Sequence, residues 1–463
     1  MKNIFVTVRD SFHQFNTSIE RKPLSLHFSR LQNVVDQYSS GSVLCIVSIP
    51  YEELPKITIG MSRRKIFEKN PKILFSNKYI IGESYSLYDI ATYQKFGLNI
   101  ADNKFIVDLA CKEGNIDFLK WWISSDIPLH YSENAIKYTC QNANIDILNW
   151  WLESNLPIKY SHTALDCYHT DINVLNWWIN SGLELKYTEK TIDIIKFPKI
   201  LDWWINSGLE LKYSSDAMDR ASMFGYIDVL NWWKESGLTL KYTNQAIDKA
   251  CYHGKIKTLN WWLNSGLDIK YTPCIEISIG EFSDSKIIKI FEWWKNSGLY
   301  FYFHVNIVNW ISIDRRINSF KWLFSNNIKL EYSEESMDNT YDIEMLNVWK
   351  YSGLELKYTF NNIDNASCYK YIDTLNWWLN SGLELKYSEK SMDYCNHIDI
   401  LDWWINSGLE LKYSKKTLDR ILILKNINEH IDILNWWINS GLELKYSEKY
   451  SDKMSEILNN NHK

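Results

Sequence analysis

The chain contains few of the residues that interrupt regular structure. Only 17 glycines and 8 prolines occur in 463 residues, which excludes collagen-like proteins and Pro/Gly-rich disordered chains. Hydrophobic residues make up 46% and charged residues 23% of the sequence, so the chain can bury a large core and is not disordered as a whole. At this length we expect either several domains or a linear array of repeated units.

Arginine is rare as well. The sequence has 51 Lys and Arg residues against 56 Asp and Glu, with a net charge of −5, and only nine of its basic residues are Arg. Nucleic-acid binding depends largely on basic side chains that neutralise phosphates. A mildly acidic, Arg-poor chain lacks that feature, so we do not expect nucleic acid to be its partner.

The eight cysteines include no CxxC pair, and such scattered cysteines in a long chain are typical of reduced thiols in the cytoplasm. The first 14 residues contain no signal-peptide core, and the sequence has no run of 18 apolar residues that could cross a membrane. These absences predict a soluble cytoplasmic protein without a membrane partner.

Tryptophan, in contrast, is abundant and follows a pattern. Twenty of the 23 tryptophans form Trp-Trp pairs. Two degenerate copies, Trp322-Leu323 and Val348-Trp349, bring the number of registers to twelve. The heptapeptide SGLELKY also recurs six times, first at Ser181–Tyr187. A repeated unit therefore governs most of the chain, and its ten complete pairs are Trp121-Trp122, Trp150-Trp151, Trp177-Trp178, Trp203-Trp204, Trp232-Trp233, Trp261-Trp262, Trp293-Trp294, Trp377-Trp378, Trp403-Trp404 and Trp436-Trp437.

One complete unit, Tyr213–Tyr242, shows how each repeat is built. Ser214 can cap a short first helix over Ala217–Ser222. A second, amphipathic helix begins near Ile227 and ends at Gly237. That last register is Gly in nine of twelve units and Asn or Asp in the others, the preference of a left-handed residue after a helix. The following LELKY predicts a short extended connector with one buried face, its Glu and Lys side chains facing solvent.

Insertions and deletions are confined to one part of the unit. The distance from each Trp register to the next first-helix alanine position is always 14 residues, and every length change lies between that position and the next Trp pair. The second helix and connector therefore form the rigid stacking element, whereas the first helix and its turn vary in length. Pro273 occupies the first position of one predicted first helix, where proline is well tolerated.

The unit resembles an ankyrin repeat. Ala217–Leu238 (AMDRASMFGYIDVLNWWKESGL) aligns with the ankyrin pattern of two helices, with Ala221, Gly225, Leu230 and Gly237 at its packing and turn positions and a Trp pair in place of Leu-Leu. The resemblance covers roughly residues 89–459. It implies a mainly α, ankyrin-like solenoid of about 12–13 short helical-hairpin repeats.

Two features depart from the ankyrin pattern. The connector is about four residues short of the usual repeat of roughly 33, so the protruding β-finger is expected to be absent, and Asp replaces His in the first helix, as at Asp219. The chain is most similar to the degenerate, Trp-rich ankyrin-type proteins of giant viruses that infect amoebae. That resemblance implies protein contacts with the host, in the host cytoplasm.

Residues 1–85 lack the repeat. The β-leaning runs Val43–Ile49, Lys56–Ile59 and Lys72–Ile81 predict a small α+β domain that also covers the first repeat. Residues 86–447 then form the solenoid, and 448–463 form a polar C-terminal half-repeat and tail. Neither end contains a convincing F-box.

No motif indicates catalysis or a cofactor. The sequence has no Gly-rich phosphate loop, GxSxG or HExxH. Cys167-Tyr168-His169 and Cys251-Tyr252-His253 could suggest a metal site, but the other units do not supply the four ligands of structural zinc. The Asp residues recur identically in unit after unit, which predicts capping and helix-dipole roles and not an acid–base pair. We expect no enzyme activity, metal or cofactor.

Two interpretations of the Trp pairs remain open. Their rings could stack on the bases of single-stranded nucleic acid, or both could fill the core between repeats. Their place on the apolar face of an amphipathic helix, in an acidic chain, favours the core.

The positions that vary between units predict a protein-binding surface, because invariant positions of a solenoid build the stack and variable ones are free to recognise partners. The function we expect is a non-catalytic protein–protein interaction scaffold. One alternative is an adaptor that recruits host proteins to a ubiquitin-ligase-type machine through the N-terminal segment, and another is nucleic-acid binding by stacking. The variable first-helix and turn positions are Tyr168, His169, Met223, Phe224, Tyr252, His253, Arg315, Arg316, Tyr341 and Tyr369.

Overall fold

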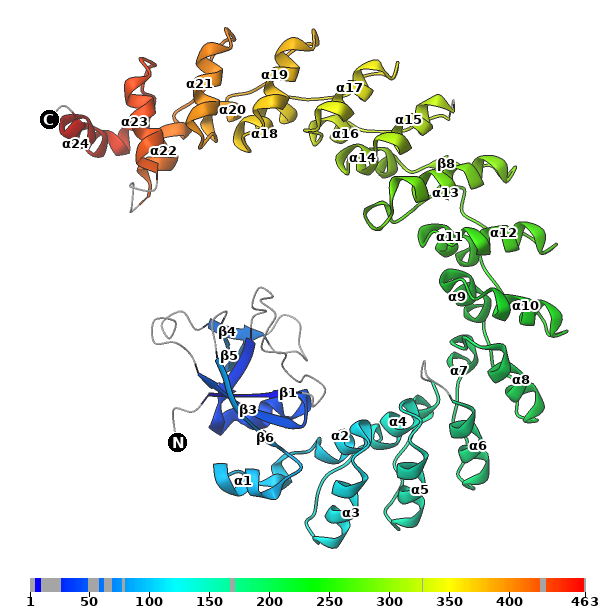
Figure 1. Ribbon diagram of the computed structural model, residues 1–463. Coiled ribbons are helices and arrows are strands. Elements are labelled where there is room, and N and C mark those ends of the chain that lie inside the picture. The colour runs from blue at the N-terminus through cyan, green and yellow to red at the C-terminus, as the bar shows by residue number, and fades with distance from the viewer. Residues whose placement is uncertain are drawn as a thin grey trace. The chain divides into compact units, whose positions relative to one another are not determined.

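The computed structural model describes residues 5–9, 26–48, 58–61, 69–76, 80–166, 171–326, 328–424 and 430–461. The expected mainly helical repeat fold, with a small sheet region near the N-terminus, is confirmed (Figure 1). The chain forms two contact units, one of residues 1–218 with 231–241 and the other of residues 219–230 with 242–463. The boundaries at 85 and 447 remain predictions.

The N-terminal segment forms a six-stranded antiparallel sheet in the order β4-β5-β2-β1-β3-β6. A 3-10 helix, Leu31–Ser40, follows the second strand and buries Val34 and Tyr38. Ser42 of this segment donates to the Glu113 carboxylate of the first repeat, with an Oγ–Oε1 distance of 2.7 Å. The strands are β1 (Phe5–Arg9), β2 (Leu26–Arg30), β3 (Val43–Ser48), β4 (Thr58–Met61), β5 (Lys69–Ser76) and β6 (Ile80–Ser86).

The sequence pattern located part of this sheet. The predicted run Val43–Ile49 is confirmed as a strand over β3, Val43–Ser48, and Ile49 lies outside the described residues. Lys72–Ile81 was expected to be one run, but it spans the end of β5 and the start of β6, which are separate strands. Strands β1 and β2, each only five residues long, were not predicted.

Twelve second helices carry the Trp registers, one in each unit. Eleven of them are nine residues long and α13 has 13, whereas the first helices vary from three to nine residues, which confirms the uneven lengths inferred from the insertions. The second helices are α3 (Ile116–Ser124), α5 (Ile145–Glu153), α6 (Ile172–Asn180), α8 (Pro198–Asn206), α10 (Ile227–Glu235), α12 (Ile256–Asn264), α13 (Asp284–Asn296), α15 (Ile317–Ser325), α17 (Ile343–Tyr351), α19 (Ile372–Asn380), α21 (Ile398–Asn406) and α23 (Ile431–Asn439).

The first helices of residues 242–463 form one row and the second helices another (Figure 1). Helix α1 (Ile90–Phe96) precedes the repeats and α24 (Ser451–Asn461) follows them. The first helices are α2 (Ile106–Glu113), α4 (Asn134–Gln141), η4 (His162–Ala164), α7 (Lys190–Asp193), α9 (Asp216–Phe224), α11 (Gln245–Tyr252), α14 (Val305–Ile313), α16 (Glu335–Asp338), α18 (Asn361–Cys368), α20 (Lys390–Asp393) and α22 (Lys416–Leu422).

The left-handed residue after each second helix is confirmed. Gly382 has φ +73°, and a Cβ there would meet nothing within 4 Å, so glycine is required by backbone conformation and not by crowding. Asp126 and Asn155 adopt the same region at φ 53° and 57°. The third exception, Asn327, lies outside the described residues.

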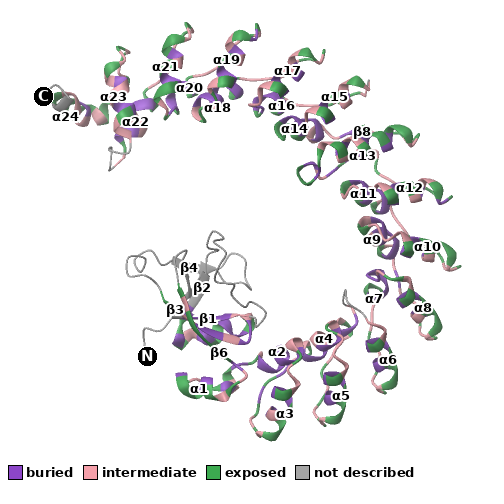
Figure 2. Cartoon of the chain, viewed as in Figure 1, coloured by how far each residue is buried: buried purple, intermediate pink, exposed green. Residues whose placement is uncertain are grey.

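The two tryptophans of a pair occupy different environments. The second residue of each register is at most 6% exposed, as at Trp378, whereas most first rings, including Trp377, are half-buried. The expectation that both rings fill the core is therefore wrong for most first rings, which are only half-buried. Figure 2 shows how buried and exposed residues alternate along the helices of the repeats. The paired rings meet edge to face, and the Trp377 Nε1–H donates to Asn347 of the preceding unit at 2.8 Å. Six more first tryptophans make the equivalent bond to an Asn or Asp.

The connector joins neighbouring units through its Lys and Tyr. The Tyr358 ring packs on Trp378 of the next unit, with centroids 4.7 Å apart, and its hydroxyl donates to the Glu384 carbonyl at 3.1 Å. Lys386 places its Nζ 4.6 Å from the Tyr358 centroid and donates to the Tyr358 carbonyl. The Glu384 side chain is 77% exposed, but the lysine does not face solvent freely as expected. It is held by a cation–π contact between units.

The recurrent Asp binds the next unit instead of capping its own helix, which corrects the sequence prediction. The Asp364 carboxylate accepts the Ser388 N–H at 2.9 Å and the Ser388 hydroxyl, and the same hydroxyl accepts the Lys390 N–H, as expected of a helix-starting Ser. We call this contact the Asp–Ser/Thr staple. It joins Asp108–Ser132, Asp166–Thr188, Asp193–Ser214, Asp219–Thr243, Asp248–Thr272, Asp338–Thr359, Asp364–Ser388, Asp393–Ser414 and Asp419–Ser447.

In one unit an extended chain takes the place of the first helix. Residues 274–281 instead form β7 (Cys274–Ile275) and a short 3-10 turn, η5 (Ile279–Glu281), and β7 pairs in parallel with β8 (Tyr302–Phe303). The prediction that Pro273 starts a first helix is wrong. The following IEISIG alternates buried Ile with exposed or half-buried residues, a period of two that suits an extended chain.

We expect Trp378→Ala to lower the free energy of unfolding by about 3–5 kcal/mol, because the buried indole leaves a cavity. Trp377→Ala should cost only about 1–2 kcal/mol, because it removes a half-buried ring and one hydrogen bond. Urea unfolding followed by circular dichroism measures both. Equal costs would contradict the assignment of core and edge rings.

We expect Asp364→Ala to lower the free energy of unfolding by about 2 kcal/mol, since it removes two hydrogen bonds to a charged acceptor. Asp364→Asn should cost clearly less, because Asn309 occupies the same register and bonds Ser333 through both of its amide atoms. Glu384→Ala is the exposed control. The staple has no stabilising role if all three variants unfold at the same urea concentration.

Candidate recognition surface

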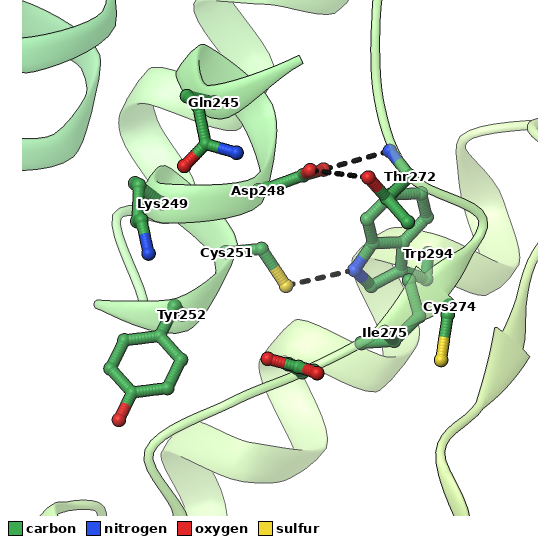
Figure 3. A pocket seen from close by; sticks show the side chains of 10 residues that line it. Gln245, Asp248, Lys249, Cys251, Tyr252, Thr272, Cys274, Ile275 and Trp294 are labelled. Carbon is green, nitrogen blue, oxygen red and sulfur yellow. Dashed lines mark hydrogen bonds between the residues drawn. The ribbon is translucent and has the colours of Figure 1, made fainter.

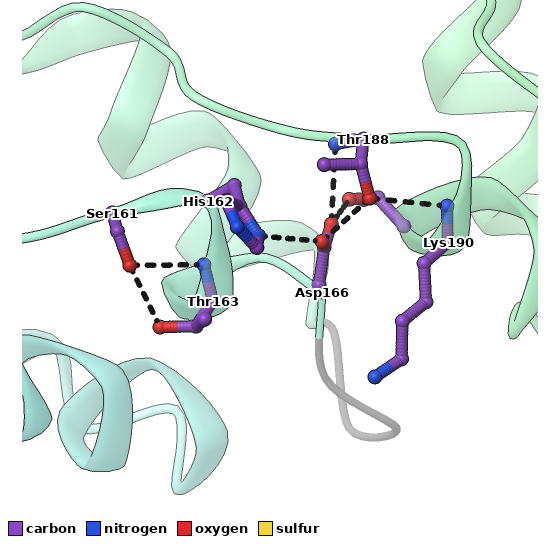
Figure 4. A network of polar contacts seen from close by, with 7 residues as sticks. Ser161, His162, Thr163, Asp166, Thr188 and Lys190 are labelled. Carbon is purple, nitrogen blue, oxygen red and sulfur yellow. Dashed lines mark hydrogen bonds and ion pairs between the residues drawn. The ribbon is translucent and has the colours of Figure 1, made fainter.

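The staple carboxylates are occupied by structural hydrogen bonds. Asp166 accepts the Thr188 hydroxyl at 2.6 Å, the Thr191 hydroxyl, and His162 Nδ1–H at 2.9 Å (Figure 4). Burial by itself would raise the pKa of Asp166, but these hydrogen bonds favour the charged form more strongly and lower the pKa. A carboxylate with so many donors is a poor general base.

Other staple carboxylates shift in the opposite direction. Burial raises the pKa of Asp108, Asp193 and Asp364, and the Ser hydrogen bonds only partly offset it. Each of these three carboxylates accepts both the N–H and the hydroxyl of a Ser in the next unit.

The described residues contain no group of three or more His, Cys, Asp and Glu that could hold a metal ion. The Cys251 thiol is buried, its pKa is raised to about 12 by burial, and its sulfur accepts the Trp294 Nε1–H at 3.1 Å. Its neighbour His253 is half-buried on the turn. The other candidate group, Cys167, Tyr168 and His169, lies outside the described residues.

The eight remaining candidate residues all belong to the contact unit of residues 219–230 and 242–463, and they lie at the end of a first helix or in the turn that follows it. Phe224, Tyr252 and Tyr369 are exposed by 40%, 38% and 66%. Arg315 is also exposed, whereas four candidates are half-buried and offer less surface than expected. These four are Met223, His253, Arg316 and Tyr341. We refer to the eight residues as the turn edge.

The structure groups some turn-edge residues with aromatic residues that sequence reasoning missed. Tyr341 stacks on Tyr371 with centroids 4.6 Å apart, and Tyr369 lies 6.5 Å from the same ring. Phe224 stacks on Tyr226 at 5.6 Å. Tyr226 and Tyr371 share one variable register, the residue just before the second helix, and that register is the signal that could have found them. Aromatic and Arg side chains are typical anchors of protein interfaces.

A cavity of about 240 Å³ opens beside the irregular unit, between α11 and β7 (Figure 3). Asp248 and Thr272 form a staple at its rim, and the Cys251–Trp294 hydrogen bond crosses its wall. Tyr252 of the turn edge also lines it, with Lys249 Nζ 5.8 Å from the Tyr252 centroid. Lys249 is thus a positively charged side chain in the lining of this cavity.

Within the described residues, no helix is long and apolar enough to cross a membrane.

Comparisons with known proteins link part of the chain to a giant virus. Over 96 residues it is 36% identical to the uncharacterized protein L696 of Acanthamoeba polyphaga mimivirus, a match that spans 20% of this chain and only 27% of the viral protein. No family model matches the chain. The ankyrin resemblance is thus not confirmed, although the likeness to a protein of a giant virus of amoebae is.

Two solved structures align at a low level. The pentatricopeptide repeat protein PPR10 from maize is 10% identical, with a TM-score of 0.25 over 78% of this chain and 56% of that chain. The same protein in complex with an 18-nt psaJ RNA element also scores 0.25, over 75% and 60% of the two chains. Scores this low define no shared fold, and no binding property follows for this chain.

The opposite pKa shifts of Asp166 and Asp364 predict opposite pH responses. Asp166 has a lowered pKa when folded, so its charged form stabilises the fold above the ordinary Asp pKa of about 3.9, and this contribution is lost as the pH falls through the lowered value. Asp364 has a raised pKa, so as the pH falls it takes up its proton in the folded state before it does so in the unfolded state. Its contribution to the free energy of unfolding therefore increases as the pH falls towards about 4.

Urea unfolding between pH 7 and pH 3.5 tests this, with Asp166→Asn and Asp364→Asn as references that cannot titrate. The unmodified chain should gain free energy of unfolding relative to Asp364→Asn as the pH falls. Relative to Asp166→Asn, it should lose free energy of unfolding only near pH 3.5. Parallel curves would refute the opposite shifts.

Proposed function

We propose that the protein is a non-catalytic protein–protein interaction scaffold that recognises its partner through the turn edge. The support is that recurrent residues and variable residues have different roles. The recurrent Trp, Tyr, Lys, Asp and Ser/Thr side chains are occupied by contacts between units, as in the Tyr358–Trp378 packing and the Asp364–Ser388 staple. The exposed aromatic and Arg side chains of the turn differ from unit to unit, as a recognition surface requires.

The partner we propose is a host protein in the cytoplasm of an infected cell. The support is the partial similarity to a mimivirus protein. The matched stretch covers 27% of that protein, so the role of its remaining length does not extend to this chain.

Co-purification after proximity labelling in infected amoebae tests the proposal with the full chain. The test variant is the quadruple Phe224→Ala, Tyr252→Ala, Arg315→Ala and Tyr369→Ala. We expect it to lose the specifically labelled proteins while its unfolding temperature stays within a few degrees, because these side chains are exposed. The matched control replaces four exposed connector glutamates, Glu184, Glu210, Glu384 and Glu410, by Ala.

The recovered molecules separate the alternatives. An unchanged protein set from the quadruple variant refutes binding through the turn edge. Ubiquitin-ligase subunits retained by both variants would favour the adaptor alternative. Salt-sensitive recovery of RNA or DNA in place of protein would favour nucleic-acid binding.

A further inference from the structure

The irregular unit opens a second cavity next to the first. A helix is about 10 Å wide and an extended chain about half that, so β7 and η5 cannot fill the space that a first helix fills elsewhere. The second cavity, of about 370 Å³, lies between η5 and α14 and shares Tyr252 and Glu276 with the first cavity. Its volume falls in the roughly 300–1,000 Å³ range of ligand pockets.

At the junction between this unit and the next, both partners of the Asp–Ser/Thr staple are replaced. The Asp register holds Ile277, which is buried, and the Ser/Thr register holds His304. His304 accepts the Asn306 N–H through Nδ1 at 3.2 Å. The neutral ring therefore carries its proton on Nε2, which is left as a donor beside the cavity.

Two aromatic rings line the second cavity. Trp310 belongs to α14 and is 47% exposed, and Tyr252 belongs to the turn edge and is 38% exposed. Trp310 is the only tryptophan of the sequence outside the twelve Trp registers. The stacking of repeats therefore does not require an indole at this position.

The charges at this cavity have one sign. Glu276 and Asp314 line it, no Lys or Arg does, and both carboxylates are exposed. Among the residues that the structure describes, neither side chain has a hydrogen-bond or ion-pair partner. Asp314 faces η5, since a Cβ on Gly280 would lie 3.9 Å from its Oδ2. The two arginines that follow Asp314 have partners: Arg315 pairs with Asp342, and Arg316 donates to the carbonyl of Ile279, a residue that lines this cavity.

We propose that this second cavity binds a lysine or arginine side chain of a protein partner. Aromatic faces attract cations through their quadrupoles, and two unpaired carboxylates add Coulombic attraction. The His304 Nε2–H supplies a donor for a peptide carbonyl. In the first cavity the Lys249 side chain is already part of the lining, whereas no Lys or Arg lines the second cavity. This inference rests on the proposed protein-binding function and adds the chemistry of the partner: an exposed basic segment.

Fluorescence anisotropy with the full chain tests the proposal. The probes are four fluorescein-labelled Gly/Ser peptides that differ only in their central residue: Lys, Arg, norleucine or citrulline. We expect the Lys and Arg peptides to bind at least about tenfold more tightly than their neutral counterparts, with affinity falling as salt rises. Equal binding of all four, or no binding of the Lys and Arg peptides, overturns the proposal.

Variants locate the site. Glu276→Gln combined with Asp314→Asn, and separately Trp310→Leu, should each weaken the Lys and Arg peptides about tenfold or more. The matched controls, Glu410→Gln and Tyr351→Leu, remove an exposed charge and an exposed ring elsewhere and should leave binding unchanged. Circular dichroism checks that every variant is folded. Equal loss in the controls overturns the assignment.

The two hypotheses can fail separately. If the quadruple turn-edge variant loses its labelled partners but the peptides show no preference for Lys or Arg, the scaffold function stands and the cation site is wrong. If the peptides bind as expected while the labelled proteins are unaffected by the turn-edge variant, the cavity binds cations but the turn edge is not the recognition surface.

Discussion

Each unit has an apolar face that only its neighbour can cover, and the rest of the structure depends on that constraint. The second helix is too short to bury its own indole, so the second Trp is enclosed by the Tyr of the preceding connector. An indole buries more apolar area than a Leu and keeps one polar N–H. Several second tryptophans donate that N–H to a side chain on the first helix of the preceding unit. Trp262 donates to the Ser222 hydroxyl and Trp404 to the Ser367 hydroxyl.

The polar groups at each junction also join neighbouring units. A buried carboxylate is costly unless it is hydrogen-bonded, and each staple Asp receives both an N–H and an O–H from the next unit. The staple therefore sets the register between neighbours, while the Trp and Tyr rings supply the burial. The unit that has Ile277 in the Asp register is also the one whose first helix is replaced by an extended chain. Residues of that chain line both cavities, and the second cavity lies at the junction with His304.

Sequence reasoning succeeded where one residue type had one physical role. Gly382 and its equivalents marked the left-handed helix ends, because few residues tolerate positive φ. Sequence reasoning failed where a residue was expected to act within its own unit but contacts the neighbouring one. Asp364 and Lys386 were interpreted within a single repeat, but both act across a junction. Tyr226 and Tyr371 were missed for a similar reason, since stacking of Tyr371 on Tyr341 of another unit leaves no trace in local spacing.

The sequence alone determined the repeat, the number of Trp registers and the ends of the second helices, because these depend on local periodicity and on backbone preference. Only the tertiary structure decided which Trp of a pair is core, which carboxylates are bound and where space remains open. Those properties depend on contacts between residues some 20–40 positions apart, as in the bonds from Trp377 to Asn347 and from Ser388 to Asp364. The spacing of the repeat shows that units are alike, but only the packing of one unit on the next shows what each side chain contacts.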